Sequence, residues 1–582
     1  MTDLKTEPSG LRKALREKYK YEGNGLVIIE SICGDLGKLL RDYRVEGVNG
    51  RFWTDKLLRH ILSRARIKAE LKRRGYGFDD PEVDKYVDKI HPPEAEVSAD
   101  YTPLGAFLKV FALLVLQERC HDIRHFVNAG FNDQKLPIRI ENNTVYPLTG
   151  PNTPIACFEG WKSSEKEYFE SYQWRVDTPY FSSTADEPLK VHYLHKDTCK
   201  PWRRSRETPS DAHDDVSDNM GTFGIVTRVD IHPTSHSYQQ LLASINLDCT
   251  KFAIKTLHTT SHDNDSKFQE EWKMLKLFNG LKHPHLVTAL CAFQCAEERG
   301  FIFPSAICDL SEYLERREPP RHRKVTIWLS NQLLGLIGAL QTIHNPKHID
   351  QGVASGYGRH GDIKCDNVLC FKKSGDEDEI VLVISDFGLS TLNSAKSCSN
   401  IPNQRVPPVP GYCPPECKIE GGTISRAFDI WTMGCLFLEL ITWFLGGPRY
   451  VEEFDDARTT MSINGANNNV FYSFTRRPDR ESYAVQVKAE VVEWIIKLHQ
   501  RAYCSEFLHD TLDIISKEMI VVITQGRNRS SSRQILNAFQ KLSSKCTKKT
   551  GYVIGKPWTA DKAETVGKSI RKGNVAVDAI PR

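Results

Sequence analysis

The sequence predicts an α+β protein in which a mainly helical N-terminal domain precedes a small β-rich lobe and a large helical lobe. Three observations support this prediction. Apolar residues recur at helical spacing through the first 135 residues. From about residue 216 to 542, short alternating runs come first and long apolar helical runs follow, which is typical of a sheet-rich unit joined to a helical one. The chain has 582 residues, enough for several domains of about 100–200 residues each.

Changes in composition divide the chain into four predicted segments. Residues 1–150 form the helical N-terminal domain, and residues 151–215 form an aromatic-rich connecting segment that ends in a polar linker. Residues 216–542 hold the two lobes. Residues 543–582 are basic and contain few large apolar side chains, so we expect a flexible tail there.

Charge and hydropathy argue against nucleic-acid and membrane partners. The 78 basic and 74 acidic residues nearly cancel, and the basic stretch at 64–74 has no interleaved aromatic residues. Nucleic-acid binding is therefore disfavoured. We find no apolar run of about 18 residues, the length that crosses a bilayer. The best candidate, residues 107–116, contains Lys109 and is expected to be a buried helix.

The compartment is predicted from the cysteines and the start of the chain. The 16 cysteines include no C-x-x-C pair, so we expect reduced thiols rather than a zinc site. The first 20 residues lack the apolar core of a secretory signal. We therefore expect a cytoplasmic or nuclear protein that is not secreted.

Two short segments suit the binding of a nucleotide. Gly221 and Gly224 bracket a turn, and glycines let backbone N–H groups approach phosphates closely. In the alternating run that follows, Ala253 and Lys255 share one strand face, where a small residue leaves room for a flat ring. Read separately, the segments are better explained as an ordinary hairpin and as an edge strand with a solvated lysine.

The next helix carries a carboxylate inside its apolar stripe. Phe268, Glu271, Leu275 and Phe278 fall on one face, and a carboxylate there is costly unless it is paired. Glu270 lies off the stripe and is expected to be solvated.

The decisive motif is H-G-D-I-K-C-D-N at residues 360–367, followed after a connecting segment by an apolar strand at 380–384 and S-D-F-G at 385–388. Each short motif alone occurs by chance. Together with the two earlier segments, in this order, they resemble the protein kinase family over about residues 216–542. The wording of residues 357–364 is also similar to a kinase-like group of filamentous fungi that carries a helical N-terminal extension.

The resemblance implies a two-lobed protein-kinase fold, ATP and Mg²⁺ as cofactors, and phosphoryl transfer to serine or threonine hydroxyls of a protein substrate. Asp362 corresponds to the base that accepts the hydroxyl proton, and Lys364 to the lysine that contacts the transferred phosphoryl group. Lys255 corresponds to the lysine that orients the ATP phosphates, and Glu271 to its helix partner. The implied Mg²⁺ ligands are Asn367 and Asp386.

The implied contacts with ATP come from several segments. They are Gly221, Phe223, Gly224, Val226, Ala253, Lys255, Phe303, Pro304, Ala306 and Leu369. The resemblance also makes Arg529 the ion-pair partner of Glu416.

The chain departs from the family pattern in several places. Asn219 replaces the first loop glycine, and about fourteen extra residues before Lys255 look like a surface insertion. Gly361 replaces the arginine of H-R-D, so it cannot bind a phosphate on the activation loop, as expected of a non-RD kinase. The altered loop and the long extensions keep a second hypothesis open, a catalytically silent pseudokinase that acts as an interaction scaffold.

Two questions remain open from sequence. The physiological substrate and pathway are not indicated. The N-terminal domain could recruit a substrate, bind a regulatory partner, dimerise or restrain the kinase, and nothing in its sequence separates these roles.

Overall fold

The computed structural model describes residues 35–73, 79–93, 105–182, 189–205, 219–221, 224–247, 249–257, 264–279, 283–320, 323–346, 357–373, 375–393, 401–402, 411–462, 465–477, 483–573, 575–579 and 581. The chain divides into two compact units. The first contains residues 1–241, 250–259 and 290–303, and the second contains residues 242–249, 260–289 and 304–582. Helices and antiparallel strands occur in both, so the predicted α+β class is confirmed.

The first unit begins with a helical domain built around α6 (Leu108–Leu116). Eight of the nine residues of α6 are buried, as expected for a helix that is apolar almost all round. The elements around it are α2 (Leu36–Asp42), α3 (Asp55–Ile61), α4 (Arg64–Arg73), α5 (Asp80–Ile90), α7 (Ile123–Asn128), α8 (Ser163–Val176) and the hairpins β1 (Val45–Gly47)/β2 (Gly50–Phe52) and β3 (Ile138–Glu141)/β4 (Thr144–Pro147).

The helical domain extends beyond residue 150, where the sequence analysis ended it. Phe158, Trp161 and Phe169 belong to the same hydrophobic core as Phe126. The ring of Phe158 lies 5.1 Å from that of Phe126 and 5.0 Å from that of Phe169. The predicted boundary is therefore wrong, because the Pro- and Asn-rich stretch that suggested it is a surface turn within this domain.

A cluster of charged residues, of which Asp133 is buried and the others are partly buried, packs against this core. Lys109 Nζ lies 3.2 Å from Asp55 Oδ1 and 2.9 Å from Asp177 Oδ1. Asp133 Oδ1 accepts the N–H of Val110 at 3.0 Å, while Asp133 Oδ2 is buried without a hydrogen-bond partner among the described residues. Burial raises the pKa of Asp133 to about 7, against the lowering effects of the Val110 amide and the Lys109 charge.

This shift predicts a pH-dependent stability. Asp133 stays protonated in the folded state up to about pH 7, whereas the unfolded chain releases the proton near the usual value of 3.8. The stabilisation is therefore complete below about pH 4 and is lost as the pH rises to about 7. We expect Asp133→Asn to flatten the decline of melting temperature between about pH 4.5 and 7.5. The exposed Asp84→Asn is the control, and equal slopes for wild type and Asp133→Asn would contradict this prediction.

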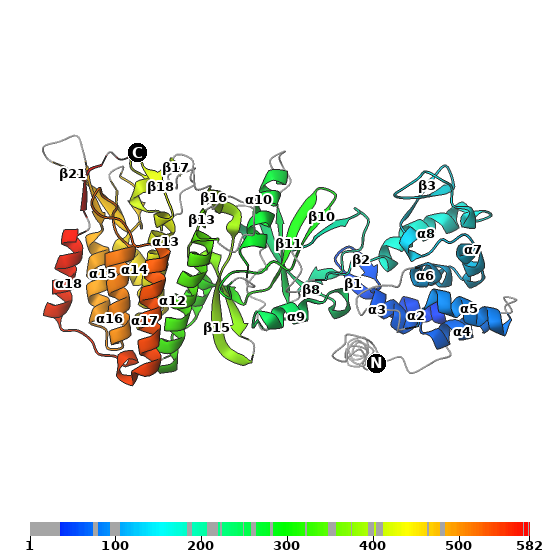
Figure 1. Ribbon diagram of the computed structural model, residues 1–582, viewed down its shortest axis with the longest axis horizontal. Helices are drawn as coiled ribbons and strands as arrows, with labels where there is room; N and C mark the ends of the chain where they lie inside the picture. Colours follow the sequence, from blue (N-terminus) through cyan, green and yellow to red (C-terminus); the bar gives the residue numbers. More distant parts are fainter. Residues whose placement is uncertain are drawn as a thin grey trace, which may run out of the picture. The chain divides into compact units, whose positions relative to one another are not determined.

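The sheet of the first unit has seven strands in the order β5-β10-β11-β9-β8-β6, with β7 paired to β8. Figure 1 labels three of them, β8, β10 and β11. The strands are β5 (Val191–Leu194), β6 (Trp202–Arg204), β7 (Asn219–Gly221), β8 (Gly224–Ile231), β9 (Phe252–Leu257), β10 (Cys291–Cys295) and β11 (Glu298–Pro304). Both edge strands, β5 and β6, come from the predicted connecting segment. β5 pairs in parallel with β10, with Val191 opposite Ala292, and β6 pairs with β8, with Trp202 opposite Ile231.

The predicted surface insertion before Lys255 is instead largely buried. Residues 232–241 contain a 3-10 turn (Pro233–Ser235) and the start of α9 (Tyr238–Ser244). Thr234 Oγ1 lies 2.6 Å from Thr54 Oγ1 of the helical domain, and the backbone of Phe181 exchanges hydrogen bonds with Ser235 and Ser237. The prediction was wrong because this segment forms part of the contact between the helical domain and the sheet.

The second unit contains the long helices. Its larger elements are α10 (Asn264–Leu277), α11 (Leu310–Arg316), α12 (Arg323–His344), β13 (Tyr357–Arg359), β14 (Val368–Lys373), β15 (Asp376–Ile384), β16 (Thr391–Asn393), α13 (Ala427–Gly446), α14 (Pro448–Arg458), β21 (Tyr472–Arg476), β22 (Tyr483–Val487), α15 (Ala489–His499), α16 (Glu506–Ile514), α17 (Ser532–Lys548), α18 (Ala560–Gly573) and β23 (Val575–Ala579). The short pairs are β17 (Ile401–Pro402)/β18 (Thr423–Ile424) and β19 (Thr460–Met461)/β20 (Asn467–Asn468), and β12 (Cys308–Asp309) pairs with β14.

Helix α13 is a long apolar helix that was not expected from the sequence. It is 20 residues long, and by length and composition it is the one helix among the described residues that could cross a membrane. Its apolar window is completely buried inside the protein. The sequence analysis missed this run because Asp429 and Glu439 interrupt it.

The C-terminal segment is folded, contrary to the flexible tail predicted for residues 543–582. Helix α17 continues to Lys548, α18 packs along α15, and β23 adds a strand to β22 (Figure 1). Ala563, Gly567 and Ile570 face inward at helical spacing, while basic residues occupy the exposed face. The average composition of the segment concealed this amphipathic pattern.

We therefore expect α18 to stabilise the second unit. Ile570 is 3% exposed, so Ile570→Asp would place an unpaired carboxylate against α15 and destabilise the protein by about 2–3 kcal/mol. Lys568→Asp introduces the same residue on the exposed face and should change the melting temperature little. Equal melting temperatures for the two variants would show that α18 contributes no packing.

Candidate functional site

The centre of the candidate site is the segment between β13 and β14, which holds Asp362, Lys364 and Asn367 together. The side-chain amide nitrogen of Asn367 donates to Asp362 O at 2.8 Å and to Asp362 Oδ2 at 2.7 Å. Lys364 Nζ lies 3.7 Å from Asp362 Oδ2 and 3.8 Å from Asp366 Oδ2. The Asp362 carboxylate is thus held by a neutral donor with a cation nearby, an arrangement that suits a proton acceptor.

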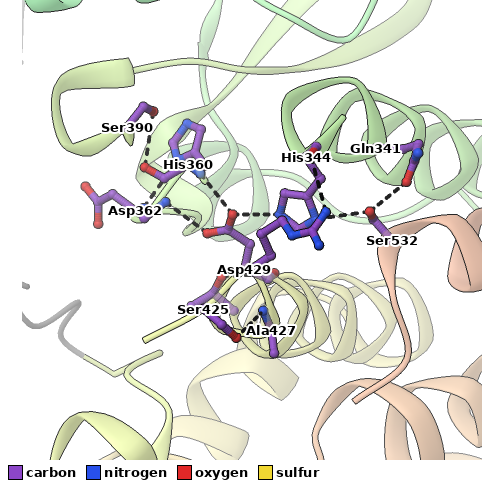
Figure 2. A network of polar contacts seen from close by, with 12 residues as sticks. Gln341, His344, His360, Asp362, Ser390, Ser425, Ala427, Asp429 and Ser532 are labelled. Atoms are coloured by element: carbon purple, nitrogen blue, oxygen red, sulfur yellow. Dashed lines mark hydrogen bonds and ion pairs between the residues drawn. The ribbon is translucent and has the colours of Figure 1, made fainter. Parts of the chain in front are cut away.

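Asp429 of α13 fixes the backbone of this segment from below (Figure 2). Its carboxylate accepts the N–H groups of His360 and Gly361, both at 2.9 Å, and contacts His344 Nε2 at 2.8 Å. Burial alone would raise the pKa of Asp429, but the hydrogen bond and charge of His344, the charge of His360 and the Gly361 amide together hold it below its usual value. Asp429 was not predicted as a site residue, although a carboxylate in an otherwise apolar helix was a usable signal.

The same hydrogen-bond network continues from His344 to Ser532, the first residue of α17. His344 Nδ1 lies 3.0 Å from Ser532 Oγ, which donates to Gln341 Oε1 at 2.7 Å (Figure 2). On the opposite side, Ser390 Oγ donates to the carbonyl of His360 at 3.1 Å. Three elements, α12, α13 and the start of α17, therefore position the Asp362 backbone.

Position 361 requires glycine for steric reasons. Its φ is +85°, and a Cβ atom there would lie 3.0 Å from the carbonyl oxygen of Leu389. Side chains other than glycine are strained in that conformation. The backbone conformation at position 361 therefore disfavours arginine, or any other residue with a side chain, in this chain.

The side chain of Arg359 lies close to the place that a side chain at position 361 would occupy. Its Nε is 3.5 Å from where the Cβ of residue 361 would be. The side chain is 5% exposed, and its Nε and Nη1 have no hydrogen-bond partner among the described residues. Burial lowers the pKa of Arg359, and the Asp429 charge opposes that effect. Arg359 belongs to the 357–364 segment that resembles the fungal kinase-like group, but the sequence suggested no role for its side chain.

The end of β15 brings Asp386 next to this segment. Ser385 donates both its N–H, at 2.9 Å, and its Oγ, at 3.0 Å, to the carbonyl of Asn367, and His360 Nε2 contacts the Ser385 carbonyl at 3.0 Å. Asp386 follows with a φ of +58°, and its Oδ1 accepts the Gly388 N–H at 3.2 Å. The Phe387 ring then packs 5.4 Å from the His360 ring.

Asn367 and Asp386 together fit a Mg²⁺ ion. Mg²⁺ prefers oxygen ligands, and a carboxylate with an amide oxygen is a suitable donor set. Because the amide nitrogen of Asn367 is committed to Asp362, its oxygen is the end that can bind a metal.

In the first unit, Lys255 and the glycine-rich segment lie on adjacent strands. Lys255 of β9 is 9% exposed and stands opposite Val226 of β8, with Ala253 two positions away on the same strand face. Gly221 and Gly224 face each other where β7 meets β8. A Cβ on Gly224 would lie 2.5 Å from the Thr256 carbonyl, so strand packing alone requires this glycine.

The remaining predicted nucleotide contacts are distributed between the two units. Phe303 and Pro304 end β11, Ala306 follows them, and Leu369 lies in β14, opposite Val383. Phe223 lies outside the described residues.

Helix α10 has the predicted phase. Glu271 is buried together with Phe268, Leu275 and Phe278, whereas Glu270 is exposed. The Phe278 ring lies 6.0 Å from that of Phe387, which connects this helix to the segment after Asp386.

The predicted ion pair of Glu416 with Arg529 is confirmed. Arg529 Nη1 lies 2.6 Å from Glu416 Oε1, and Nη2 lies 2.9 Å from Oε2. Arg529 also donates to the carbonyls of Val521 and Ala427, and its guanidinium lies over the Trp431 ring. The Arg529 side chain has no exposed surface.

Comparison with known families agrees with this geometry. The family model described as protein kinase domain matches residues 241–542, slightly more than half of the chain. The chain belongs to the protein kinase family. The kinase match begins within α9, so the glycine-rich segment lies before the matched residues.

Three relatives of this kinase are cyclin-dependent kinase 14 of Oryctolagus cuniculus, the CTD kinase subunit alpha of Schizosaccharomyces pombe and cyclin-dependent kinase 2 of Caenorhabditis elegans. The first is 26% identical over 193 residues, covering 33% of this chain and 36% of the relative. The second is 27% identical over 171 residues, covering 29% of this chain and 25% of the relative. The third is 24% identical over 220 residues, covering 38% of this chain and 50% of the relative. The chain thus matches a quarter to a half of each relative's length, and its place in a fungal subgroup stays a prediction.

Proposed function

We propose that this protein is an active serine/threonine-protein kinase that transfers the terminal phosphoryl group of ATP to hydroxyl groups of proteins. The observation that carries the proposal is the arrangement of Asp362, Lys364 and Asn367, in which the Asp362 carboxylate accepts a hydrogen bond from the Asn367 amide at 2.7 Å and lies 3.7 Å from the Lys364 ammonium. Such preorganised polar groups stabilise the charge that develops in phosphoryl transfer. The relatives named as cyclin-dependent kinases favour serine or threonine as the acceptor.

Each residue has a distinct task in the proposed reaction. Asp362 accepts the proton of the substrate hydroxyl as its oxygen attacks the phosphorus atom, and Lys364 screens the negative charge of the transferred group. Lys255 orients the ATP phosphates, and Asn367 and Asp386 hold the metal. Mg²⁺, when bound, supplies the positive charge that neutralises the phosphate oxygens.

The alternative is a pseudokinase that binds partners without catalysis. Its support is Asn219 in the glycine-rich segment, together with the long extensions. Against it, Lys255, Glu271, Asp362, Lys364, Asn367 and Asp386 are all present.

An assay of the full chain with Mg²⁺ and radiolabelled ATP separates the two functions. We expect label on serine and threonine of mixed peptide substrates and little label on tyrosine. A folded protein that binds ATP, yet labels neither peptides nor itself, would support the pseudokinase. Label mainly on tyrosine would contradict the acceptor class.

Glu271 offers a matched test of the proposed site. Glu271→Gln should lower turnover by about 10²-fold, because it removes one charge from a preorganised electrostatic group. Glu270→Gln on the exposed face of α10 should be nearly neutral. Steady-state kinetics of the two variants check this, and the reverse order would remove Glu271 from the catalytic machinery.

A further inference from the structure

A cluster of three metal-ligating side chains lies in the second unit, apart from the residues proposed for phosphoryl transfer. It consists of His499 at the end of α15, Cys504 in the following loop and His509 in α16. One ligand atom from each lies within 4.8 Å of the others. His499 Nδ1 is 2.8 Å from His509 Nδ1, and Cys504 Sγ is 3.4 Å from the same nitrogen. All three side chains are buried.

The hydrogen bond on the far side of His509 determines its tautomer. His509 Nε2 lies 2.9 Å from the carbonyl oxygen of Lys556, which can only accept, so Nε2 carries the proton. The Nδ1 of a neutral His509 then has a lone pair directed at the other two ligand atoms.

Hydrogen bonds alone do not satisfy this cluster. The single lone pair of His509 Nδ1 faces two donors, the N–H of His499 and the S–H of Cys504. His499 Nε2 is buried without a partner among the described residues whichever tautomer His499 adopts, so only the Nδ1 side bears on the ligand question. A cation at the point where Nδ1, Nδ1 and Sγ converge would give each of the three ligand atoms its own partner.

The surroundings hold the two imidazoles in place. The Trp558 ring stacks on His499 at 4.1 Å and on His509 at 4.2 Å between ring centroids. The backbone N–H of Trp558 donates to the His499 carbonyl at 3.0 Å, and the backbone N–H of Lys556 donates to the Cys504 carbonyl at 2.8 Å. The Lys556 carbonyl on His509 Nε2 is the type of outer contact that orients a metal-binding histidine.

We propose that His499, Cys504 and His509 bind one thiophilic metal ion, Zn²⁺ or Cu⁺, which ties the α15–α16 turn to the segment that carries Trp558. Thiolate with imidazole suits both ions. For Cu⁺, one thiolate and two neutral imidazoles make an electrically neutral site with three ligands. Zn²⁺ normally takes a fourth ligand, such as a water molecule. In either case Cys504 releases its proton as the sulfur–metal bond forms.

The test measures metal retained by the full-length protein. Metal-free protein is incubated with Zn²⁺ alone, or with Cu⁺ alone without oxygen, then freed of unbound metal and analysed by atomic emission. Co²⁺ serves as a spectroscopic probe of the zinc arm, because a sulfur ligand gives a charge-transfer absorption band. The variants are Cys504→Ser, His499→Phe and the control Cys546→Ser, which alters another fully buried cysteine of the same unit.

We expect wild type and Cys546→Ser to retain one metal ion per chain and to melt at a higher temperature when it is bound. Cys504→Ser and His499→Phe should retain no metal ion, and added metal should not raise their melting temperatures. If Cys504→Ser does not fold, His499→Phe decides the matter, because phenylalanine keeps a ring against Trp558. Retention of neither ion by wild type, or equal retention by the ligand variants, would overturn the proposal. The ion retained, Zn²⁺ or Cu⁺, identifies the metal.

Discussion

Asp362→Asn is expected to lower turnover by about 10²–10⁴-fold while leaving the affinity for ATP nearly unchanged. The carboxylate accepts the hydroxyl proton only as the transition state forms, so its removal affects the chemical step rather than the binding of the nucleotide. Asparagine keeps the size of the side chain and one oxygen to face the Asn367 amide. Kinetics with a peptide substrate, together with equilibrium binding of ATP, measure the two effects separately.

Asp366→Asn is the matched control. Asp366 lies within the same segment and also approaches Lys364, at 3.8 Å, but its side chain is 62% exposed. We expect less than about a threefold change, since exposed ion pairs contribute little. If Asp362→Asn keeps more than about a tenth of the wild-type turnover, Asp362 is not the base.

Arg529→Ala is expected to cause the largest loss of stability, about 3–5 kcal/mol. The substitution leaves the Glu416 carboxylate, only 13% exposed, without its cation. It also removes the donors that satisfy the carbonyls of Val521 and Ala427. Denaturant unfolding followed by circular dichroism measures this loss.

Lys556→Ala provides the comparison, because Lys556 pairs with Glu506 while its own side chain is 74% exposed. Its expected cost is below about 1 kcal/mol. A loss of less than about 1 kcal/mol for Arg529→Ala would mean that the pair with Glu416 can be replaced by water or by a neighbouring residue.

Features set by local sequence were predicted well. The phase of α10 followed from four apolar or acidic positions, and it separated Glu271 from Glu270 correctly. The segment from Asp362 to Asn367 is equally local, since its hydrogen bonds join residues five apart. The partner of Glu416 was also found, although 113 residues separate it from Arg529, because the resemblance to a family supplied it.

Features that depend on distant pairing were missed. Nothing in the four residues of β5 indicates that they pair with β10, because the partner strand lies elsewhere in the chain. The amphipathic helix α18 was hidden by its basic composition, and Asp429 was treated as part of a core helix. The H-x₄-C-x₄-H spacing of residues 499–509 was missed for a different reason, because it is local and contains no closely spaced pair of cysteines, the pattern expected of a zinc site.

The parallel pairing of β5 with β10 bears on the order in which the chain folds. Val191 must find Ala292, about a hundred residues later, so this edge of the sheet cannot form until the ribosome has released β10. The helical domain precedes both strands and has its own core, so it can fold first. Such a distant contact closes a long loop and slows folding. Until then β5 remains an unpaired strand with which other chains could pair.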